Sequence, residues 1–183
     1  MNRVSSQPSG NLVIFGGWFF GRVVDETAEL LGWTVVGFVD PDPPAWITAL
    51  THVPDNASAI VAIGNNPQRA LVHSKVLQCG RSLVSIVHPT ACVSRSATLD
   101  AGCYLAEFAT IRSNSSVGAG TILNSGSVVS HDCQLAALLP SVRTPQRQVT
   151  FRLVQGRCLA WAHVSGLTQR SDLIAKWARA EPS

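Results

Sequence analysis

A six-residue repeat in the second half of the chain constrains the fold more than any other feature of the sequence. From residue 87 onward an aliphatic side chain recurs at every sixth position, at Val87, Val93, Leu99, Leu105, Ile111, Val117, Leu123, Val129 and Leu135. Four residues after each of the first eight stands a small side chain, namely Ala91, Ala97, Cys103, Ala109, Ser115, Thr121, Ser127 and Cys133. A fixed period of this kind is the sequence signature of a repeat architecture.

The repeat predicts a parallel β-helix over residues 87–136. In such a fold the chain turns a corner at the end of every repeat, the aliphatic side chain fills the interior, and only a small side chain fits near the corner. Three repeats make one triangular coil, so the segment supplies not quite three coils. The alternative is an ordinary series of edge strands with coincidental spacing, and nine successive matches make it a poor one.

Residues 1–86 follow a different pattern, in which apolar runs alternate with helical stretches. Four runs predict strands, each apolar on both faces, at 11–16, 34–40, 58–64 and 82–88. The stretches at 20–33 and 66–80 predict helices, the second with Pro67 in its first turn and Gly80 at the position of a C-terminal cap. Alternating strands and helices indicate a small parallel sheet, and we predict a Rossmann-like α/β domain over 1–86.

The last quarter of the chain, residues 137–183, has a different composition. Residues 1–136 carry seven basic and nine acidic side chains, whereas this tail carries seven basic and two acidic ones. The repeat fails at once, because its next corner position holds the bulky Leu139, followed by Pro140. We expect an atypical Arg-rich tail with a terminal helix that begins near Ser171, a residue type favoured at N-caps.

Composition excludes several classes of function. The net charge of +3 is too mild to indicate a nucleic-acid surface. No apolar run approaches the roughly 18 to 20 residues of a membrane span, and the apolar start "NLVIFGGWFF" runs into charged residues without a small-residue cleavage site, so we expect neither membrane insertion nor secretion. Five scattered cysteines without a C-x-x-C pair indicate no metal site and fit a reducing cytoplasm.

Five local motifs, in fixed order, carry a resemblance that extends from about Leu12 to Cys133. They are "VIFGG...FGRVV", "GFVDPD", "AIGNNPQR", "SIVHPTACVS" and "LNSGSVVSHDC". With them the chain resembles the sugar O- and N-acetyltransferases of the sialic acid O-acetyltransferase and bacillosamine N-acetyltransferase type. The resemblance implies a left-handed β-helix, a homotrimer with active sites between subunits, acetyl-CoA as co-substrate, and a sugar nucleotide or sialic acid as acceptor.

The histidine of the "HDC" triplet is His131, and Asp132 follows it at once. The resemblance implies that His131 is the general base that takes a proton from a sugar amine or hydroxyl as this group attacks the thioester of acetyl-CoA. An imidazole suits the role because its ordinary pKa is about 6.5. We expect Asp132 to orient the ring or to stabilise the imidazolium. Without the resemblance, a solvent-exposed histidine at a β-helix corner is the simpler interpretation.

The first domain holds the acceptor site that the resemblance implies. Candidate binding residues are Gly16, Gly17, Gly21, Asp40, Gly64, Asn65 and Asn66, together with Asn124 of the repeat. The glycines let backbone N–H groups approach a phosphate or sugar, and Asp40 is placed to accept hydrogen bonds from a ribose or base. Asn124 either positions substrate or His131, or satisfies backbone groups in a turn. Trp18 and Phe19 depart from the small residues usual in the family, and either block the crevice or form a stacking platform.

The tail also departs from the family. There, further coils and a second histidine nine residues after the first form much of the acetyl-CoA pocket, and here that position is Pro140. We hypothesise that 137–183 derive from a frameshift or a gene-end rearrangement, which translation of the other two frames after about codon 136 would test. Three functions stay open: an acetyltransferase with reduced or lost activity, a non-catalytic sugar-nucleotide-binding or trimer-forming protein, and an NAD-dependent oxidoreductase, which "GGWFFG" disfavours.

Overall fold

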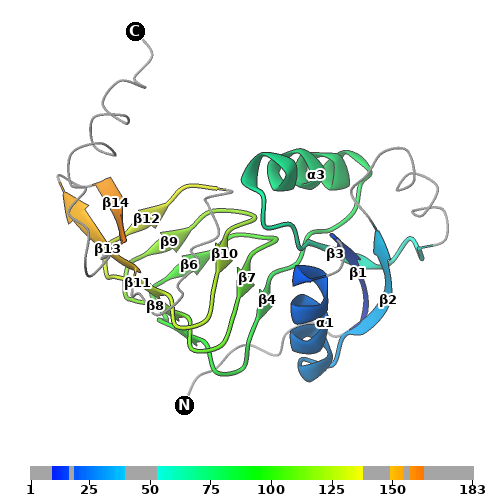
Figure 1. Ribbon diagram of the computed structural model, residues 1–183, viewed down its shortest axis with the longest axis horizontal. Coiled ribbons are helices and arrows are strands. Elements are labelled where there is room, and N and C mark those ends of the chain that lie inside the picture. The colour runs from blue at the N-terminus through cyan, green and yellow to red at the C-terminus, as the bar shows by residue number, and fades with distance from the viewer. Residues whose placement is uncertain (1–9, 17–18, 40–52, 138–148, 155–156, 163–183) are drawn as a thin grey trace, which may run out of the picture.

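The computed structural model describes residues 10–16, 19–39, 53–137, 149–154 and 157–162. Within them, an α/β unit is followed by a three-sided parallel β-helix (Figure 1). The α/β unit consists of β1 (Asn11–Phe15), α1 (Phe20–Leu30), β2 (Thr34–Val39), β3 (Ser58–Val61) and α3 (Asn66–Gln78). The order of the two expected architectures is confirmed, while the domain boundaries stay a prediction.

Three parallel strands form the sheet of the α/β unit, in the order β2-β1-β3. The central strand β1 is buried on both faces, because Leu12 and Ile14 pack toward α1 whereas Val13 packs toward α3. The expectation of two apolar, covered faces is wrong for β2, in which Val36 is 38% and Phe38 is 48% exposed. The exposure is particular to β2, because β3, the other edge strand, is buried where α3 packs on it.

Helix α3 has the two terminal signals that the sequence predicts, Pro67 and Gly80, and an N-cap that the sequence analysis assigned to substrate binding. Its N-cap is Asn65, whose Oδ1 accepts a hydrogen bond of 3.0 Å from the backbone N–H of Gln68, and Pro67 stands in the first turn. Gly80 follows the last turn with φ +71°, a conformation that glycine adopts without steric cost. The side chain of Asn65 therefore has a structural task at the start of this helix.

The β-helix is built from short strands that pair with their counterparts one coil away. In chain order they are β4 (Ile86–Val87), β5 (Cys92–Val93), β6 (Thr98–Leu99), β7 (Tyr104–Leu105), β8 (Thr110–Ile111), β9 (Ser116–Val117), β10 (Ile122–Leu123), β11 (Val128–Val129) and β12 (Gln134–Leu135). Every third strand pairs in parallel, which gives one sheet for each side of the prism, β4-β7-β10, β5-β8-β11 and β6-β9-β12. The predicted β-helix is confirmed.

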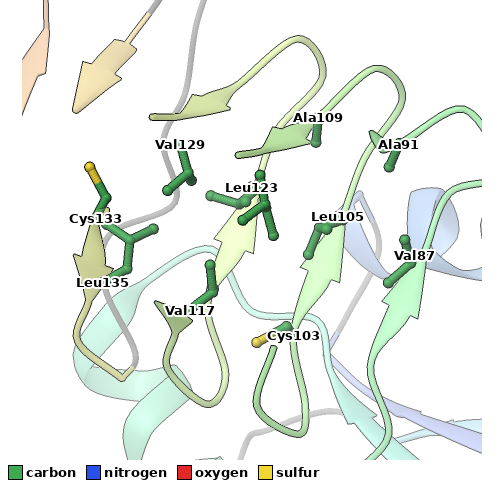
Figure 2. Packing of buried hydrophobic residues seen from close by; sticks show 11 residues of the cluster. Val87, Ala91, Cys103, Leu105, Ala109, Val117, Leu123, Val129, Cys133 and Leu135 are labelled. Carbon is green, nitrogen blue, oxygen red and sulfur yellow. The ribbon is translucent and has the colours of Figure 1, made fainter. Parts of the chain in front are cut away.

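The interior of the β-helix holds the side chains that the repeat selects. Figure 2 shows aliphatic residues from the three sides converging on the axis, with small residues beside the corners. Of the nine aliphatic positions, seven are buried and Val93 and Leu99 are partly buried. The hydroxyl residues Ser115, Thr121 and Ser127 are also buried. The six-residue period is therefore a packing requirement, because each coil stacks its aliphatic side chains on those of the next.

The segment 82–88 departs from its prediction as a further strand of the first sheet. Only Leu83 bridges to that sheet, through Ala59, and Ile86–Val87 instead form the first strand of the β-helix. The cause lies in Val87, which is the first aliphatic residue of the repeat and pairs with Leu105 one coil later. The repeat therefore outweighs the alternation of strands and helices that precedes it.

Successive corners of the β-helix contain a residue in the left-handed region. These residues stand three positions after an interior aliphatic side chain, at Gly102, Phe108, Asn114, Gly120, Gly126 and Asp132, with φ between 57° and 74°. Glycine adopts this conformation readily, and Asn and Asp tolerate it better than other residues. The corner geometry thus explains the residue types at most of these positions.

One outer side of the β-helix packs on the α/β unit. Ile86, Tyr104 and Ile122, which point outward from β4, β7 and β10, join the apolar cluster of β1 and α1. The ring of Tyr104 meets that of Phe20 edge to face, with centroids 5.3 Å apart. The Tyr104 hydroxyl lies 3.0 Å from Thr27 Oγ1, and because that oxygen donates to a backbone carbonyl of α1, the tyrosine is the donor. In Figure 1, α1 accordingly lies between the sheet and the β-helix.

A buried arginine on α3 makes a second connection between the two units. Arg69 is 0% exposed; its Nε donates to the carbonyl oxygen of Gly120 at 2.9 Å, and its Nη1 donates to that of Ile63 at 2.9 Å. His73, one turn further along α3, is buried beside Gly102, and its Nε2 has no hydrogen-bond partner among the described residues. Burial, and secondly the charge of Arg69, lower the pKa of His73.

The tail contributes a hairpin that the sequence did not predict. Strand β13 (Val149–Val154) pairs in parallel with β11 and antiparallel with β14 (Arg157–Ala162), so it extends one side of the β-helix past its last coil (Figure 1). The register joins Val128 to Thr150, a longer step than the one coil that separates Thr110 from Val128, so the period is broken. The helix expected from Ser171 lies outside the described residues.

Helices α1 and α3 have 11 and 13 residues, fewer than the roughly 20 of a membrane span.

Candidate functional site

His131 and Asp132 lie at the corner of the β-helix that follows β11. Asp132 occupies the left-handed position of that corner, with φ 57°. His131 Nδ1 is 2.7 Å from Asp132 Oδ2. The two side chains are 72% and 51% exposed, so the pair is open to solvent and to a substrate. The local geometry therefore joins the two residues that the sequence places side by side.

Asn114 contacts the same carboxylate from the preceding coil. Its Nδ2 donates to Asp132 Oδ1 at 3.2 Å, so each oxygen of Asp132 has a different partner. The hydrogen bond from His131 and then that from Asn114 hold the pKa of Asp132 below its ordinary value of 3.8. Asp132 is consequently a carboxylate over the whole physiological pH range.

An ionised Asp132 determines which nitrogen of His131 carries the proton. A carboxylate can only accept, so a neutral imidazole must donate from Nδ1 to Oδ2, and its other nitrogen, Nε2, then holds the lone pair. This tautomer follows from the hydrogen bond and not from an observed hydrogen position. The pair thereby presents a proton acceptor at a solvent-accessible corner.

Asn124 lies at a different corner from the His-Asp pair. It directly follows β10, whereas His131 lies after β11, so the side formed by β11 separates the two residues along one chain. In a solenoid, residues at one corner are either sequence neighbours or a full coil apart, and seven residues of separation fit neither case. The role of Asn124 toward His131 or substrate stays a prediction.

The carboxyl ends of β1 and β3 form a second candidate site. Gly16 has φ +135°, and an added Cβ would collide with the carbonyl oxygen of Ala62. A Cβ on Gly21 would approach the Gly16 carbonyl oxygen to 2.7 Å. Both glycines are thus required by close backbone packing where β1 passes into α1. Ligands of open parallel sheets bind at the carboxyl ends of the strands, at the point where the strand order reverses. In this sheet that point is β1.

The run Gly64–Asn66 reaches the same edge from β3. Gly64 is exposed, Asn65 caps α3, and Asn66 Oδ1 is buried without a hydrogen-bond partner among the described residues. An unpartnered buried oxygen is a group that a ligand donor would satisfy. The other two predicted binding residues, Gly17 and Asp40, lie outside the described residues, as does Trp18. Phe19 is 91% exposed at the start of α1.

The two cysteines in the interior of the β-helix do not suit nucleophilic chemistry. Cys133, two residues after His131, is buried in the interior cluster, as the small-residue position predicts. Burial raises the pKa of the Cys103 thiol to about 11, so it stays protonated at neutral pH. In the part of the chain that the structure describes, no three His, Cys, Asp or Glu side chains gather as a metal site would require.

Asn114 is the residue that sequence reasoning missed. It stands 18 positions before Asp132, which is one full coil of the predicted repeat. Arranging the sequence in columns one coil apart puts Ser96, Asn114 and Asp132 in a single column and places Asn114 beside the candidate pair. The family resemblance pointed to Asn124 instead, which belongs to another column.

An α/β unit, a hexapeptide-repeat β-helix and an exposed His-Asp pair at a corner define the class of this protein. The family described as the PglD N-terminal domain matches residues 11–76. A histidine-to-alanine mutant of GDP-perosamine N-acetyltransferase from Caulobacter crescentus, in complex with CoA and GDP-perosamine, is 33% identical, with 74% of this chain and 70% of its own covered and a TM-score of 0.65. PerB from the same organism, with the same ligands, is 34% identical, with 74% and 70% covered and a TM-score of 0.64.

The chain belongs to this family of sugar acetyltransferases. The resemblance stated from the motifs is thereby confirmed, as is the left-handed parallel β-helix that it implied. WeeI from Acinetobacter baumannii AYE, 18% identical over 71% of this chain and 68% of its own with a TM-score of 0.63, shares the fold.

Proposed function

We propose that the protein transfers an acetyl group from acetyl-CoA to the amine of a nucleotide-linked sugar, with His131 as the general base. The observation that carries the proposal is the 2.7 Å hydrogen bond between His131 Nδ1 and Asp132 at an exposed corner. Family membership supports the reaction class, since related N-acetyltransferases have been solved with CoA and GDP-perosamine. Two of these solved structures are variants in which a histidine is replaced.

The chemistry follows from the lone pair on the ring. The sugar amine attacks the carbonyl carbon of the thioester while its proton passes to His131 Nε2, and the resulting imidazolium is stabilised by Asp132. The carbon–sulfur bond then breaks, the acetyl group stays on nitrogen, and the thiolate of CoA takes the proton back from His131. Because both substrates react directly, no covalent enzyme intermediate is needed, and holding them in line supplies much of the acceleration.

The edge of the α/β sheet is the acceptor site in this proposal. Gly16 and Gly21 bring backbone close to the crevice, and Asn66 offers an unpartnered oxygen there. Asp40 and Gly17 complete the predicted set. An amine is the favoured acceptor because the related perosamine enzymes are N-acetyltransferases. A sugar hydroxyl, including one of sialic acid, is the alternative acceptor, since the same base serves either group.

We further propose that the functional unit is a homotrimer with the site between subunits. Within one chain, β11 separates Asn124 from His131, and the acceptor edge belongs to a different unit from the His131 corner. A neighbouring subunit that presents its own acceptor edge and corner residues to His131 would bring the predicted site residues together. Light scattering on the purified protein tests the assembly, and a monomer that turns over at full rate would contradict it.

We expect the binding of acetyl-CoA, the acetyl donor, to limit the rate. After β12 the repeat is not continued, and β13 joins with a broken register. With fewer coils beside His131, fewer backbone groups are available to bind acetyl-CoA, so we expect weaker donor binding than in the related perosamine enzyme. The broken register also favours a second candidate, a non-catalytic protein that binds a sugar nucleotide.

Incubation of the purified protein with acetyl-CoA and GDP-perosamine separates the two candidates. We expect release of the CoA thiol and an acetylated sugar nucleotide by mass spectrometry, both abolished in His131→Ala and retained in His88→Ala, a second histidine at a β-helix corner. Binding of the sugar nucleotide in a thermal-shift assay without any acetylated product would favour the second candidate instead.

A further inference from the structure

Two columns of corner residues in the β-helix have the same backbone and different chemistry. The first contains Thr90, Phe108 and Gly126, and the second contains Ser96, Asn114 and Asp132, each spaced by one coil. Phe108 and Asn114 have the same φ of 58°. Their common geometry makes one column an internal reference for the other.

A hydroxyl from the first coil caps the middle residue in both columns. Thr90 Oγ1 accepts from the backbone N–H of Phe108 at 3.1 Å, and Ser96 Oγ accepts from that of Asn114 at 3.0 Å. These two bonds satisfy equivalent amide groups at equivalent corners. They therefore belong to the architecture of the β-helix and are independent of the His-Asp pair.

The side chain of Asn114 makes the contact that the other column lacks. Its Nδ2 donates at 3.2 Å to Asp132 Oδ1, and the other oxygen of that carboxylate receives His131 Nδ1 at 2.7 Å. In the reference column the residue one coil after Phe108 is Gly126, which has no side chain to receive a bond. The backbone at position 114 therefore requires only a residue that tolerates the left-handed region. The side-chain amide of Asn114 is not required by the corner.

We propose that Asn114 is a positioning residue for acetyl transfer, which acts by holding Asp132 in the rotamer that fixes the tautomer of His131. The proposal rests on the proposed function. Both Asp132 and His131 are exposed, so water competes for the carboxylate and packing restrains it little. A second, directional donor on Oδ1 removes that freedom, because rotation about the side chain would break two hydrogen bonds instead of one.

The left-handed backbone at residue 114 makes a clean test possible. Glycine accepts φ 58° without strain, so Asn114→Gly removes the amide and keeps the corner. Phe108→Gly makes the same backbone change at the reference corner and is the matched control. Asn114→Asp keeps a side chain suited to this conformation but places a second carboxylate beside Asp132, which raises the pKa of Asp132 by like-charge repulsion.

Kinetics over a range of pH, with GDP-perosamine and acetyl-CoA, give the first readout. We expect Asn114→Gly to lower kcat about tenfold with little change in either KM, because a positioning bond acts on the transition state more than on binding. Asn114→Asp should in addition move the acidic limb of the kcat profile to higher pH, because a second carboxylate near the imidazole favours its protonated form. Phe108→Gly should match the wild type. A wild-type kcat and pH profile in Asn114→Gly, with His131→Ala inactive, would overturn the proposal while leaving the proposed function intact.

Nitrogen NMR of the histidine ring gives a readout that does not need turnover. In wild-type protein labelled with ¹⁵N-histidine, we expect neutral His131 to have the proton on Nδ1, assigned by comparison with His131→Ala. Asn114→Gly should show a mixture of the two tautomers. An unchanged tautomer in this variant would overturn the proposal. If the wild type shows no turnover at all, the proposed function fails, and the tautomer alone then decides whether Asn114 positions the pair.

Discussion

Two polar clusters of this molecule are built on opposite principles. At the interface of the two units, Arg69 is 0% exposed and donates to backbone carbonyls on both sides. At the corner after β11, His131 and Asp132 are mostly exposed and hydrogen-bond each other. Disturbing the buried cluster lowers the free energy of unfolding, because polar groups that lose their partner there cannot hydrogen-bond to water instead. The exposed cluster contributes little to stability and is available to a substrate.

The contrast assigns the two clusters to different tasks. Arg69 joins the carbonyl of Ile63, just after β3, to that of Gly120 on a β-helix corner, so it fixes the carboxyl ends of the sheet strands, the proposed acceptor site, relative to the β-helix. The exposed pair can change its protonation without disturbing that frame. Substitutions at the interface should therefore alter the free energy of unfolding, and substitutions at the corner should alter rate. Four variants test this division, in decreasing order of expected effect.

Arg69→Met should give the largest effect. It keeps an apolar stem of similar length but leaves the carbonyl groups of Ile63 and Gly120 buried without their donor. At about 1 to 3 kcal/mol for each unsatisfied group, the free energy of unfolding should fall by roughly 2 to 5 kcal/mol. Urea unfolding followed by circular dichroism measures it. The matched control is Arg95→Met, an exposed arginine on the β-helix, with a change within about 0.5 kcal/mol. Equal effects of the two variants would refute a structural role for Arg69.

Asp132→Asn should reduce catalysis and leave stability unchanged. The amide cannot enforce donation from His131 Nδ1 as the carboxylate does, nor stabilise an imidazolium, so we expect kcat to fall about 100-fold. Steady-state kinetics and a thermal melt on one preparation check both parts. A large loss of melting temperature alongside the loss of rate would contradict the division of tasks.

Tyr104→Phe should have a moderate effect on stability. The ring stays packed on Phe20, but the buried hydrogen bond to Thr27 Oγ1 is lost, which costs about 1 kcal/mol. Because Thr27 also donates to the backbone of α1, its hydroxyl keeps a partner. The double variant Tyr104→Phe with Thr27→Val, compared with the single variants, isolates the pair. Additive losses would show that the two hydroxyls are not coupled.

His73 should give the smallest effect, visible only as a pH dependence. Its pKa is below the ordinary 6.5 in the folded state, so the unfolded chain binds more protons, and stability falls as the pH drops below about 6.5 until the folded pKa is reached. Asp132 and Glu107 have lowered pKa values and stay ionised over this range. Between pH 7 and 5 the melting temperature of the wild type should fall further than that of His73→Gln. His88→Gln, the matched control, should behave as the wild type.

The repeat made most of the fold predictable. Nine aliphatic residues at a strict period specify the interior, because each must stack on its counterpart one coil away. Helix α3 was equally clear from Pro67 and Gly80, which act through local geometry, whereas its N-cap Asn65 was predicted as a binding residue. The exposure of Val36 and Phe38 in β2 was missed, because it depends on which elements pack on the strand and not on the apolar residues of the strand itself. Strands β13 and β14 were missed because they follow no repeat.

The candidate site was predictable only in part. His131 and Asp132 are neighbours in sequence, and the left-handed corner keeps them neighbours in space. Asn114 was missed because its contact crosses a coil, and Arg69 because nothing local distinguishes an arginine that will be buried. Asn124 was chosen from the family resemblance, and within one chain its seven-residue separation from His131 places it at another corner.

The most direct test of the account measures kcat and melting temperature of wild type and His131→Ala side by side, with acetyl-CoA and GDP-perosamine. If the exposed corner supplies the general base, kcat should fall about 100-fold to 10,000-fold while the melting temperature stays within about 1 °C. Turnover at the wild-type rate by His131→Ala would contradict the central claim.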